Sequence, residues 1–344
     1  MSQTAAQLIN ATTGTITTLT STTVNSTNAT ISNSASIGTL NATTTTVANL
    51  NGGPISGFRN RLINPAFAID QRNGGASVSS GISTVTYTVD RWYVYATGAA
   101  VAARQVSSSN TDLTNVLRIT GAASTTNVIV GQRIEAQNSY DLAGKTVTLS
   151  FYASSSASIT LGWSTYYANS SDNFTSKTSS NTGTLVTTPT LTRYSATFTL
   201  SSAATTGVAI EFTLGTLTSG TVDISGVQLE LGTVATPLER RSYGHELALC
   251  QRYYWQGLPA VALNFPSYVS GSVGSWIVSF PVTMRVPPTQ TNNTSGTTFT
   301  GCGSLSWDSA NRNGGRFLLI STTISNNCYL AFGANDYLTA AAEL

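Results

Sequence analysis

One segment near the C-terminus, residues 307–315, combines the side-chain types that recognise sugars. A flat aromatic ring packs against the apolar C–H groups of a sugar, while carboxylate, amide and guanidinium groups hydrogen-bond its hydroxyls. We expect this segment to form a glycine-ended loop, and residues 335–337 to repeat the mixture in a second loop. The alternative is a solvated turn whose Trp307 packs on the domain core. The candidate glycan-binding residues are Trp307, Asp308, Asn311, Arg312, Asn313, Asn335, Asp336 and Tyr337.

Catalytic chemistry has little support in the sequence. The chain holds one histidine, His245, so a histidine-based triad or a multi-histidine metal site cannot form within one copy. We expect His245 to be a packed or capping residue. Glycoside hydrolysis requires two carboxyl groups about 5–10 Å apart, and among the 14 acidic residues only Asp308 and Asp336 are candidates. The sequence therefore predicts a protein that is not an enzyme and requires no cofactor and no metal.

The three cysteines, Cys250, Cys302 and Cys328, show no CxxC spacing. Neither a zinc site nor a disulfide framework is indicated. Cys302 and Cys328 could pair if they lie on neighbouring strands, but buried free thiols are the expectation.

The N-terminal segment, residues 1–57, is almost entirely Thr, Ser, Asn, Ala and Gly, and Arg59 is the first charged residue. A chain this polar cannot offset its ordering entropy alone, and its Thr content favours β structure over a heptad coiled coil. We expect a stalk of three intertwined chains, a β-fibre. The alternative is a disordered Ser/Thr tether. The predicted stalk core is Ile16, Leu19, Ile37, Leu40, Val47 and Leu50.

Residues 58–241 show apolar residues at every second position, separated by Gly, Ser and Asn turns. Val147, Leu149 and Phe151 are one example. This period predicts an antiparallel β-sandwich, with a possible bulge at Gly226. We also expect Asp90 and Arg91 to form a structural ion pair that fixes a strand end beside Trp92; the alternative is a ligand-binding pair.

After this sandwich the pattern changes to helical spacing. Residues 242–255 predict a short linker helix that Ser242 could cap, and residues 239–241 (Glu-Arg-Arg) predict a clamp at the domain junction. Residues 256–344 return to strand patterns and predict a second, small β-sandwich. The fold class is therefore all-β.

Composition excludes several classes of function. Charged residues make up 9% of the chain, against about 25% in ordinary globular proteins. The net charge is +2 without a basic cluster, which argues against nucleic-acid binding. No apolar run is long enough to cross a membrane, and the N-terminus lacks a signal-peptide pattern. We expect a protein made in a cytoplasm that reaches the outside by another route.

Several blocks resemble a module of bacteriophage tail fibres, which usually opens with N-L-I-N-G-D-F-x-I-x-Q-R-G and then shows Y-T-x-D-R-W. The similarity spans about residues 58–344, and Pro65-Ala66 departs from the usual Gly-Asp, so the acidic residue of the module has no counterpart at this position. The matching blocks are NRLINPAFAIDQR (60–72), YTVDRW (87–92), GVQLELG (226–232), TPLERR (236–241), LCQRYY (249–254), FPVTMR (280–285) and AEL (342–344).

The resemblance implies a jelly-roll sandwich within a homotrimeric virion fibre. On this basis residues 1–57 attach to a tail or baseplate protein and form the stalk, and residues 256–344 meet a host surface polysaccharide or lipopolysaccharide. The alternatives are a tail-associated polysaccharide depolymerase and a head fibre or decoration protein. Nucleic-acid binding and membrane insertion are not expected.

Overall fold

The computed structural model describes residues 49–50, 53–54, 58–257, 262–267, 270–322, 325–333 and 336–344. Of the predicted stalk core, Ile16, Leu19, Ile37, Leu40 and Val47 lie outside these residues. Leu50 belongs to β1 (Asn49–Leu50), which pairs with β2 (Gly53–Pro54), and only its backbone is described. The intertwined trimeric fibre therefore stays a prediction.

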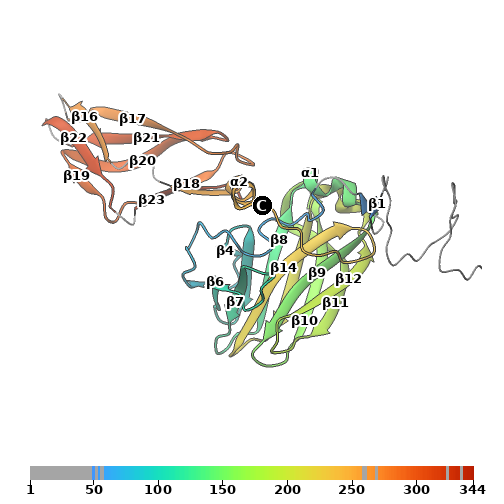
Figure 1. Cartoon of the computed structure of the whole chain (residues 1–344). Helices are drawn as coiled ribbons and strands as arrows, with labels where there is room; N and C mark the ends of the chain where they lie inside the picture. Colours follow the sequence, from blue (N-terminus) through green and yellow to red (C-terminus); the bar gives the residue numbers. More distant parts are fainter. Residues whose placement is uncertain are drawn as a thin grey trace, which may run out of the picture. The chain divides into compact units, whose positions relative to one another are not determined.

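The first sandwich contains two six-stranded antiparallel sheets (Figure 1). Their strand orders are β11-β10-β13-β8-β5-β4 and β12-β9-β14-β7-β6-β3. The strands are β3 (Val78–Ser79), β4 (Thr86–Val89), β5 (Trp92–Thr97), β6 (Ala102–Ser107), β7 (Asn115–Thr120), β8 (Asn127–Ile134), β9 (Thr146–Ser155), β10 (Thr160–Ser170), β11 (Asn173–Val186), β12 (Thr192–Thr199), β13 (Val208–Gly215) and β14 (Thr221–Leu231), with the short helices α1 (Ala136–Ser139), η2 (Tyr140–Leu142) and η3 (Ser202–Thr206) between them.

Alternation along the strands builds the core of this sandwich, as the sequence predicts. Val147, Leu149 and Phe151 on β9 are all buried. The Phe151 ring meets Phe212 of the other sheet at a centroid distance of 4.6 Å. The expected bulge is present: the β9–β14 register shifts between Ser225 and Gln228. Gly226 lies there at φ +57°, where a Cβ would contact Leu113 and Tyr152 at 2.9 Å.

The linker helix, α2 (Tyr243–Gln251), is shorter than the predicted 242–255. Ser242 precedes it without forming a side-chain cap. Tyr254 and Trp255 leave the helix because they start β15 (Tyr254–Gly257), which pairs with the C-terminal strand β23 (Tyr337–Ala341). His245 is packed, as expected: its ring stacks on Phe58 at 4.8 Å. None of the helices among the described residues has the length and apolar character to cross a membrane.

The second sandwich has three small antiparallel sheets of three strands each, ordered β15-β23-β18, β16-β22-β19 and β17-β21-β20. One core joins them, with Phe317, Leu319, Leu330 and Leu338 fully buried. The remaining strands are β16 (Ala262–Ser267), β17 (Val273–Ser279), β18 (Thr289–Asn293), β19 (Thr298–Thr300), β20 (Cys302–Asn311), β21 (Gly314–Ser321) and β22 (Ser325–Ala331).

Cys302 and Cys328 form a disulfide, so the expectation of free thiols at these positions is wrong. Cys302 begins β20 and Cys328 lies in β22, which belong to different sheets. Their Cα atoms lie 5.3 Å apart, within the range that a disulfide spans. Cys250 on α2 is a buried free thiol, as expected, and its burial raises the pKa of the thiol well above the usual value.

Candidate functional site

The candidate glycan-binding segment is a β-hairpin and not the expected long loop. Residues 307–311 complete β20, and β21 begins at Gly314, so only Arg312 and Asn313 form the turn. Asn311 pairs with Gly314 across this turn. The β20–β21 register shifts between Trp307 and Ser309, so Trp307 packs on the core side while Asp308, Ser309 and Asn311 are all exposed. This bulge divides the predicted site.

Trp307 lies on the core side of the hairpin. Its ring packs on Phe317 at a centroid distance of 3.6 Å, and Nε1 donates a hydrogen bond to the main-chain oxygen of Thr291 at 3.3 Å. Gly315 makes room for this packing, since a Cβ at that position would overlap the ring. The geometry matches the alternative interpretation, a tryptophan packed on its domain core.

Asp308 lies on the opposite, outer side and forms an ion pair with Arg316 of β21. The Arg316 Nε atom donates to Asp308 Oδ2 at 2.6 Å. Arg316 was missed by the sequence analysis. The sequence does contain a signal for it: Arg316 is a charged residue between two residues that are buried in β21, Gly315 and Phe317. Such a position places its side chain on the exposed face of the strand.

An open depression of about 520 Å³ covers this outer side. At one edge Ile277 of β17 is 81% exposed, and it lies beside Arg316 in the sheet register. Apolar surface thus lies beside hydroxyl, amide and guanidinium groups, the mixture that a sugar requires. The residues that form this mixture, called the hairpin site below, are Ile277, Ser279, Ser309, Asn311, Asn313 and Arg316.

The predicted residues around the turn have two roles. Asn311 and Asn313 line the depression. The main-chain N–H of Asn313 donates to Asn311 Oδ1 at 2.8 Å. The Thr283 hydroxyl donates to Asn313 Oδ1 at 2.9 Å. The Arg312 Nε atom donates to the main-chain oxygen of Met284 at 2.7 Å. Arg312 therefore holds the turn in place while the two asparagines face the depression.

The second predicted segment does not join the hairpin site in the structure. Asn335 lies outside the described residues, and Tyr337 is half-buried in β23. Asp336 is buried and accepts hydrogen bonds from the Thr297 hydroxyl and from the amides of Gly296 and Gly333. These hydrogen bonds lower the pKa of Asp336, and the bond from the Thr297 hydroxyl has the largest effect. The carboxylate thus joins two loops of the second sandwich.

The expected ion pair between Asp90 and Arg91 is absent, because the two side chains bond to different partners. Asp90 accepts from the main-chain and side-chain nitrogens of Gln71, and burial raises its pKa to about 7. The Arg91 guanidinium instead pairs with Glu343 and lies 3.4 Å from the ring centroid of Tyr253. Arg91 therefore ties the first sandwich to the C-terminal residues.

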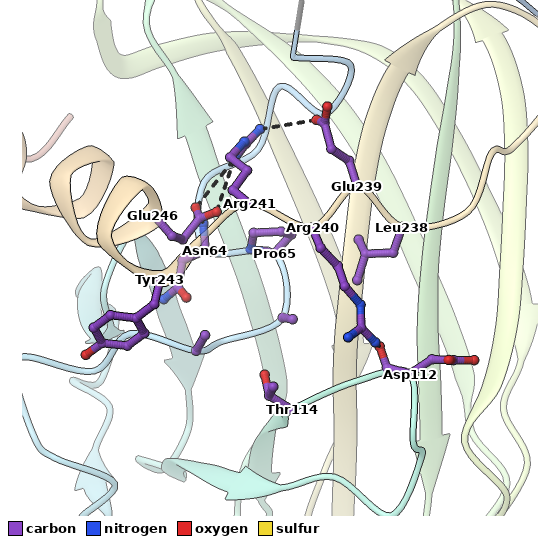
Figure 2. A pocket seen from close by; sticks show the side chains of 12 residues that line it. Asn64, Pro65, Asp112, Thr114, Leu238, Glu239, Arg240, Arg241, Tyr243 and Glu246 are labelled. Carbon is purple, nitrogen blue, oxygen red and sulfur yellow. Dashed lines mark hydrogen bonds and ion pairs between the residues drawn. The ribbon is translucent and has the colours of Figure 1, made fainter.

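The expected clamp at residues 239–241 is confirmed. Arg241 donates to the main-chain oxygens of Asn60 and Leu62. Its guanidinium lies 3.3 Å from a carboxylate oxygen of Glu246 and 3.7 Å from one of Glu239. Figure 2 shows Arg241 between these two acids, at the wall of a pocket. Arg241 thus connects the start of the first sandwich, at Asn60 and Leu62, to the first turn of α2 at Glu246.

Within the described residues no group of three or more His, Cys, Asp or Glu side chains is placed to hold a metal ion. No family model matches the sequence, and no curated protein matches it.

Matching solved structures include carbohydrate-binding modules and a phage tailspike. A family 4 module has 21% identity and a TM-score of 0.32, covering 49% of this chain and 97% of its own. A family 11 module from Clostridium thermocellum, in complex with a mixed-linked tetrasaccharide, has 12% identity and a TM-score of 0.32, covering 47% and 100%. The enzymatically active domain of tailspike protein 4 from bacteriophage CBA120 has 13% identity and a TM-score of 0.32, covering 50% and 21%. Similarities of this size do not identify a function.

Proposed function

We propose that this protein is a homotrimeric tail fibre of a bacteriophage and attaches the virion to a host surface glycan through its C-terminal sandwich. The hairpin site carries this proposal, because it exposes an apolar side chain, Ile277, beside several hydrogen-bonding groups. The sequence blocks that resemble tail fibres support the assignment to a virion. The polar N-terminal segment supports assembly from several copies.

Arg316 and the two asparagines are the proposed ligand contacts. Asp308 orients the Arg316 guanidinium through their ion pair, which leaves the exposed side of the guanidinium available to sugar hydroxyls. Ile277 supplies the apolar surface on which a sugar ring lies. An open depression buries little of a ligand, so each site binds weakly. Three copies per fibre raise the overall avidity by effective concentration, about a hundredfold or more.

We also propose that the fibre binds the glycan without cleaving it. Asp308 is paired with Arg316, and Asp336 accepts three hydrogen bonds in its ionised form. Neither carboxylate is free to donate a proton to a glycosidic oxygen, as the general acid of a glycosidase must. The engagement of both candidate acids argues against a depolymerase.

The test uses the purified full-length protein and surface polysaccharide from a bacterium that the virion infects. We expect binding of the polysaccharide, unchanged polymer length after prolonged incubation, and a solution mass of three chains. Release of reducing ends that stops in Asp308→Asn would establish the depolymerase instead. A solution mass of one chain, or the absence of polysaccharide binding, would contradict the proposal. Immunogold labelling of virions separates a tail fibre from a head fibre.

A further inference from the structure

A pocket in the first sandwich has no part in the proposed function. It has a volume of about 220 Å³ and lies between the loop 64–68 and the segment 238–246, beside Asp112 and Thr114 (Figure 2). The hairpin site belongs to the other sandwich and shares no residue with this pocket. A ligand bound here would therefore be a second, independent one.

Hydrogen bonds fix the walls of the pocket before any ligand binds. The Asn64 amide N–H donates to Glu246 Oε1 at 2.5 Å, which joins the loop to α2. On the far side the Arg240 guanidinium donates to the main-chain oxygen of Asp112. A ligand that enters a preformed pocket loses less binding free energy to the ordering of the protein.

The charges around the pocket nearly balance, with three carboxylates against two guanidinium groups. Glu239 and Glu246 both pair with Arg241, whose side chain is only 5% exposed. At the rim, Arg240 and Asp112 have opposite signs and are both exposed. The lining therefore carries one excess negative charge, which disfavours an anion. Glu239 and Glu246 already accept main-chain hydrogen bonds from Asn60 and Asn64, so an uncharged ligand fits the pocket best.

The lining of the pocket is mainly apolar. Pro65, Ala66, Ala68 and Leu238 supply ring, methyl and branched carbons. Tyr243 stands at the edge with its side chain 65% exposed, where its ring offers a flat surface to a ligand (Figure 2). Exposed tyrosine rings of this kind stack on the C–H faces of sugars.

Hydrogen-bonding groups complete the lining. The Thr114 hydroxyl and the Arg240 guanidinium border the pocket on the side away from α2 (Figure 2). Both can donate to a carbonyl oxygen. A pocket of this composition, apolar with a few polar groups, is typical of small-molecule sites.

The volume limits the ligand to about one sugar residue. A closed cavity of about 150 Å³ in another protein accommodates benzene, a six-membered ring. The pocket beside Tyr243, at about 220 Å³, has room for one six-membered ring with a substituent. Longer oligosaccharides would have to extend past Tyr243 into solvent.

We propose that this pocket binds one N-acetylhexosamine residue of a glycan. A plain hexose would place hydroxyls against Ala66 and Ala68 without partners, which is unfavourable. An acetamido group places its methyl there and directs its carbonyl oxygen to Thr114 or Arg240. The pyranose ring lies against Tyr243.

Saturation-transfer NMR on the full-length protein tests this proposal with free N-acetylglucosamine and N-acetylgalactosamine. We expect a dissociation constant on the order of 1 mM for one of them, with strong saturation of the acetamido methyl. Glucose and galactose should bind at least about tenfold more weakly. Equal binding of the plain hexoses would overturn the proposal. So would the absence of binding by any sugar at a sugar concentration about 50 times the expected dissociation constant of ~1 mM.

Variants locate the binding. Tyr243→Ala should weaken it at least about fivefold, and Ala66→Leu should abolish it by filling the pocket. Tyr140→Ala is the matched control, because Tyr140 is 64% exposed and does not line the pocket. Unchanged binding in both pocket variants at unchanged melting temperature overturns the proposal. Loss of N-acetylhexosamine binding in Arg316→Ala would assign the sugar to the hairpin site and overturn the proposal as well. If the hairpin site does not bind host glycan, N-acetylhexosamine should still bind to the pocket beside Tyr243.

Discussion

The two sandwiches differ in how they achieve stability. The first places large side chains such as Trp92, Phe151 and Phe212 in a continuous core between six-stranded sheets. The second has only three-stranded sheets and adds a disulfide between two of them. Small domains bury less of their surface and commonly need such a covalent link. The comparison predicts that the second sandwich depends on its cross-link for stability more than the first depends on any single contact.

Their outer surfaces differ as well. In the second sandwich Val273, Ile277 and Ile320 remain exposed on one sheet face, β17-β21-β20. The hairpin site lies on this face. At the junction of the first sandwich with α2, charged residues are buried against one another, as Arg241 and Glu246 are. The charged residues at this junction thus support the fold, whereas the polar residues of the hairpin site line an open depression.

The largest effect is expected from breaking the buried clamp. Arg241→Met leaves Glu239 and Glu246 without their cation, and removal of one partner from a buried ion pair costs about 3–5 kcal/mol. Chemical denaturation should show this loss in the free energy of unfolding. The exposed Arg104, changed to Ala, is the control and should change the stability by less than about 0.5 kcal/mol. Equal effects of the two variants would contradict a structural clamp.

The disulfide should affect only the second sandwich. The double variant Cys302→Ser, Cys328→Ser opens a loop with a sequence separation of 26 residues, and its loss is worth about 3 kcal/mol. Hydrogen exchange should speed up in β20 and β22 and stay slow in β9 and β13. Uniform acceleration across both sandwiches would show that they unfold as one unit.

Trp307→Ala removes a ring that packs on Phe317, and we expect it to destabilise the second sandwich by about 2–3 kcal/mol. Host-glycan binding by the fraction that remains folded should be nearly unchanged, since the ring lies on the core side. The comparison of melting temperature with binding separates the two roles. Lost binding at an unchanged melting temperature would return Trp307 to the ligand site.

The pH dependence reports on the buried Asp90. Burial raises its pKa to about 7 in the folded protein, against about 3.9 in an unfolded chain. Its contribution to stability is therefore complete below pH 4 and is lost as pH rises through 7. Between pH 5 and 8 the free energy of unfolding should fall by about 3 kcal/mol. Asp90→Asn should flatten this profile in urea titrations, and an identical slope in the variant would exclude Asp90 as its source.

Local patterns in the sequence predicted the parts of the fold that depend on periodicity. Val147, Leu149 and Phe151 alternate with polar residues, so their strand and its buried face follow directly. Leu305 and Trp307 show the same spacing. That signal pointed to a strand with an inward tryptophan, but the surrounding polar residues suggested a loop.

Contacts between distant segments could not be predicted in this way. Arg91 follows Asp90 in the chain, yet its partner is Glu343, 252 residues away. The disulfide joins strands of two different sheets, and the pocket beside Tyr243 forms where residues 64–68 meet residues 238–246. Sequence spacing carries no information on such pairings. Arg316 was missed for the same reason, since its role depends on the strand opposite.

The central claim, that the hairpin site contacts a host glycan, is tested most directly by Arg316→Ala in the full-length fibre. We expect the apparent affinity for host polysaccharide to fall at least about tenfold, because the loss is repeated in every copy. The melting temperature should hardly change, since an exposed ion pair contributes at most about 1 kcal/mol. Arg104→Ala should bind as the unchanged protein does. Polysaccharide binding by Arg316→Ala equal to that of Arg104→Ala would contradict the account.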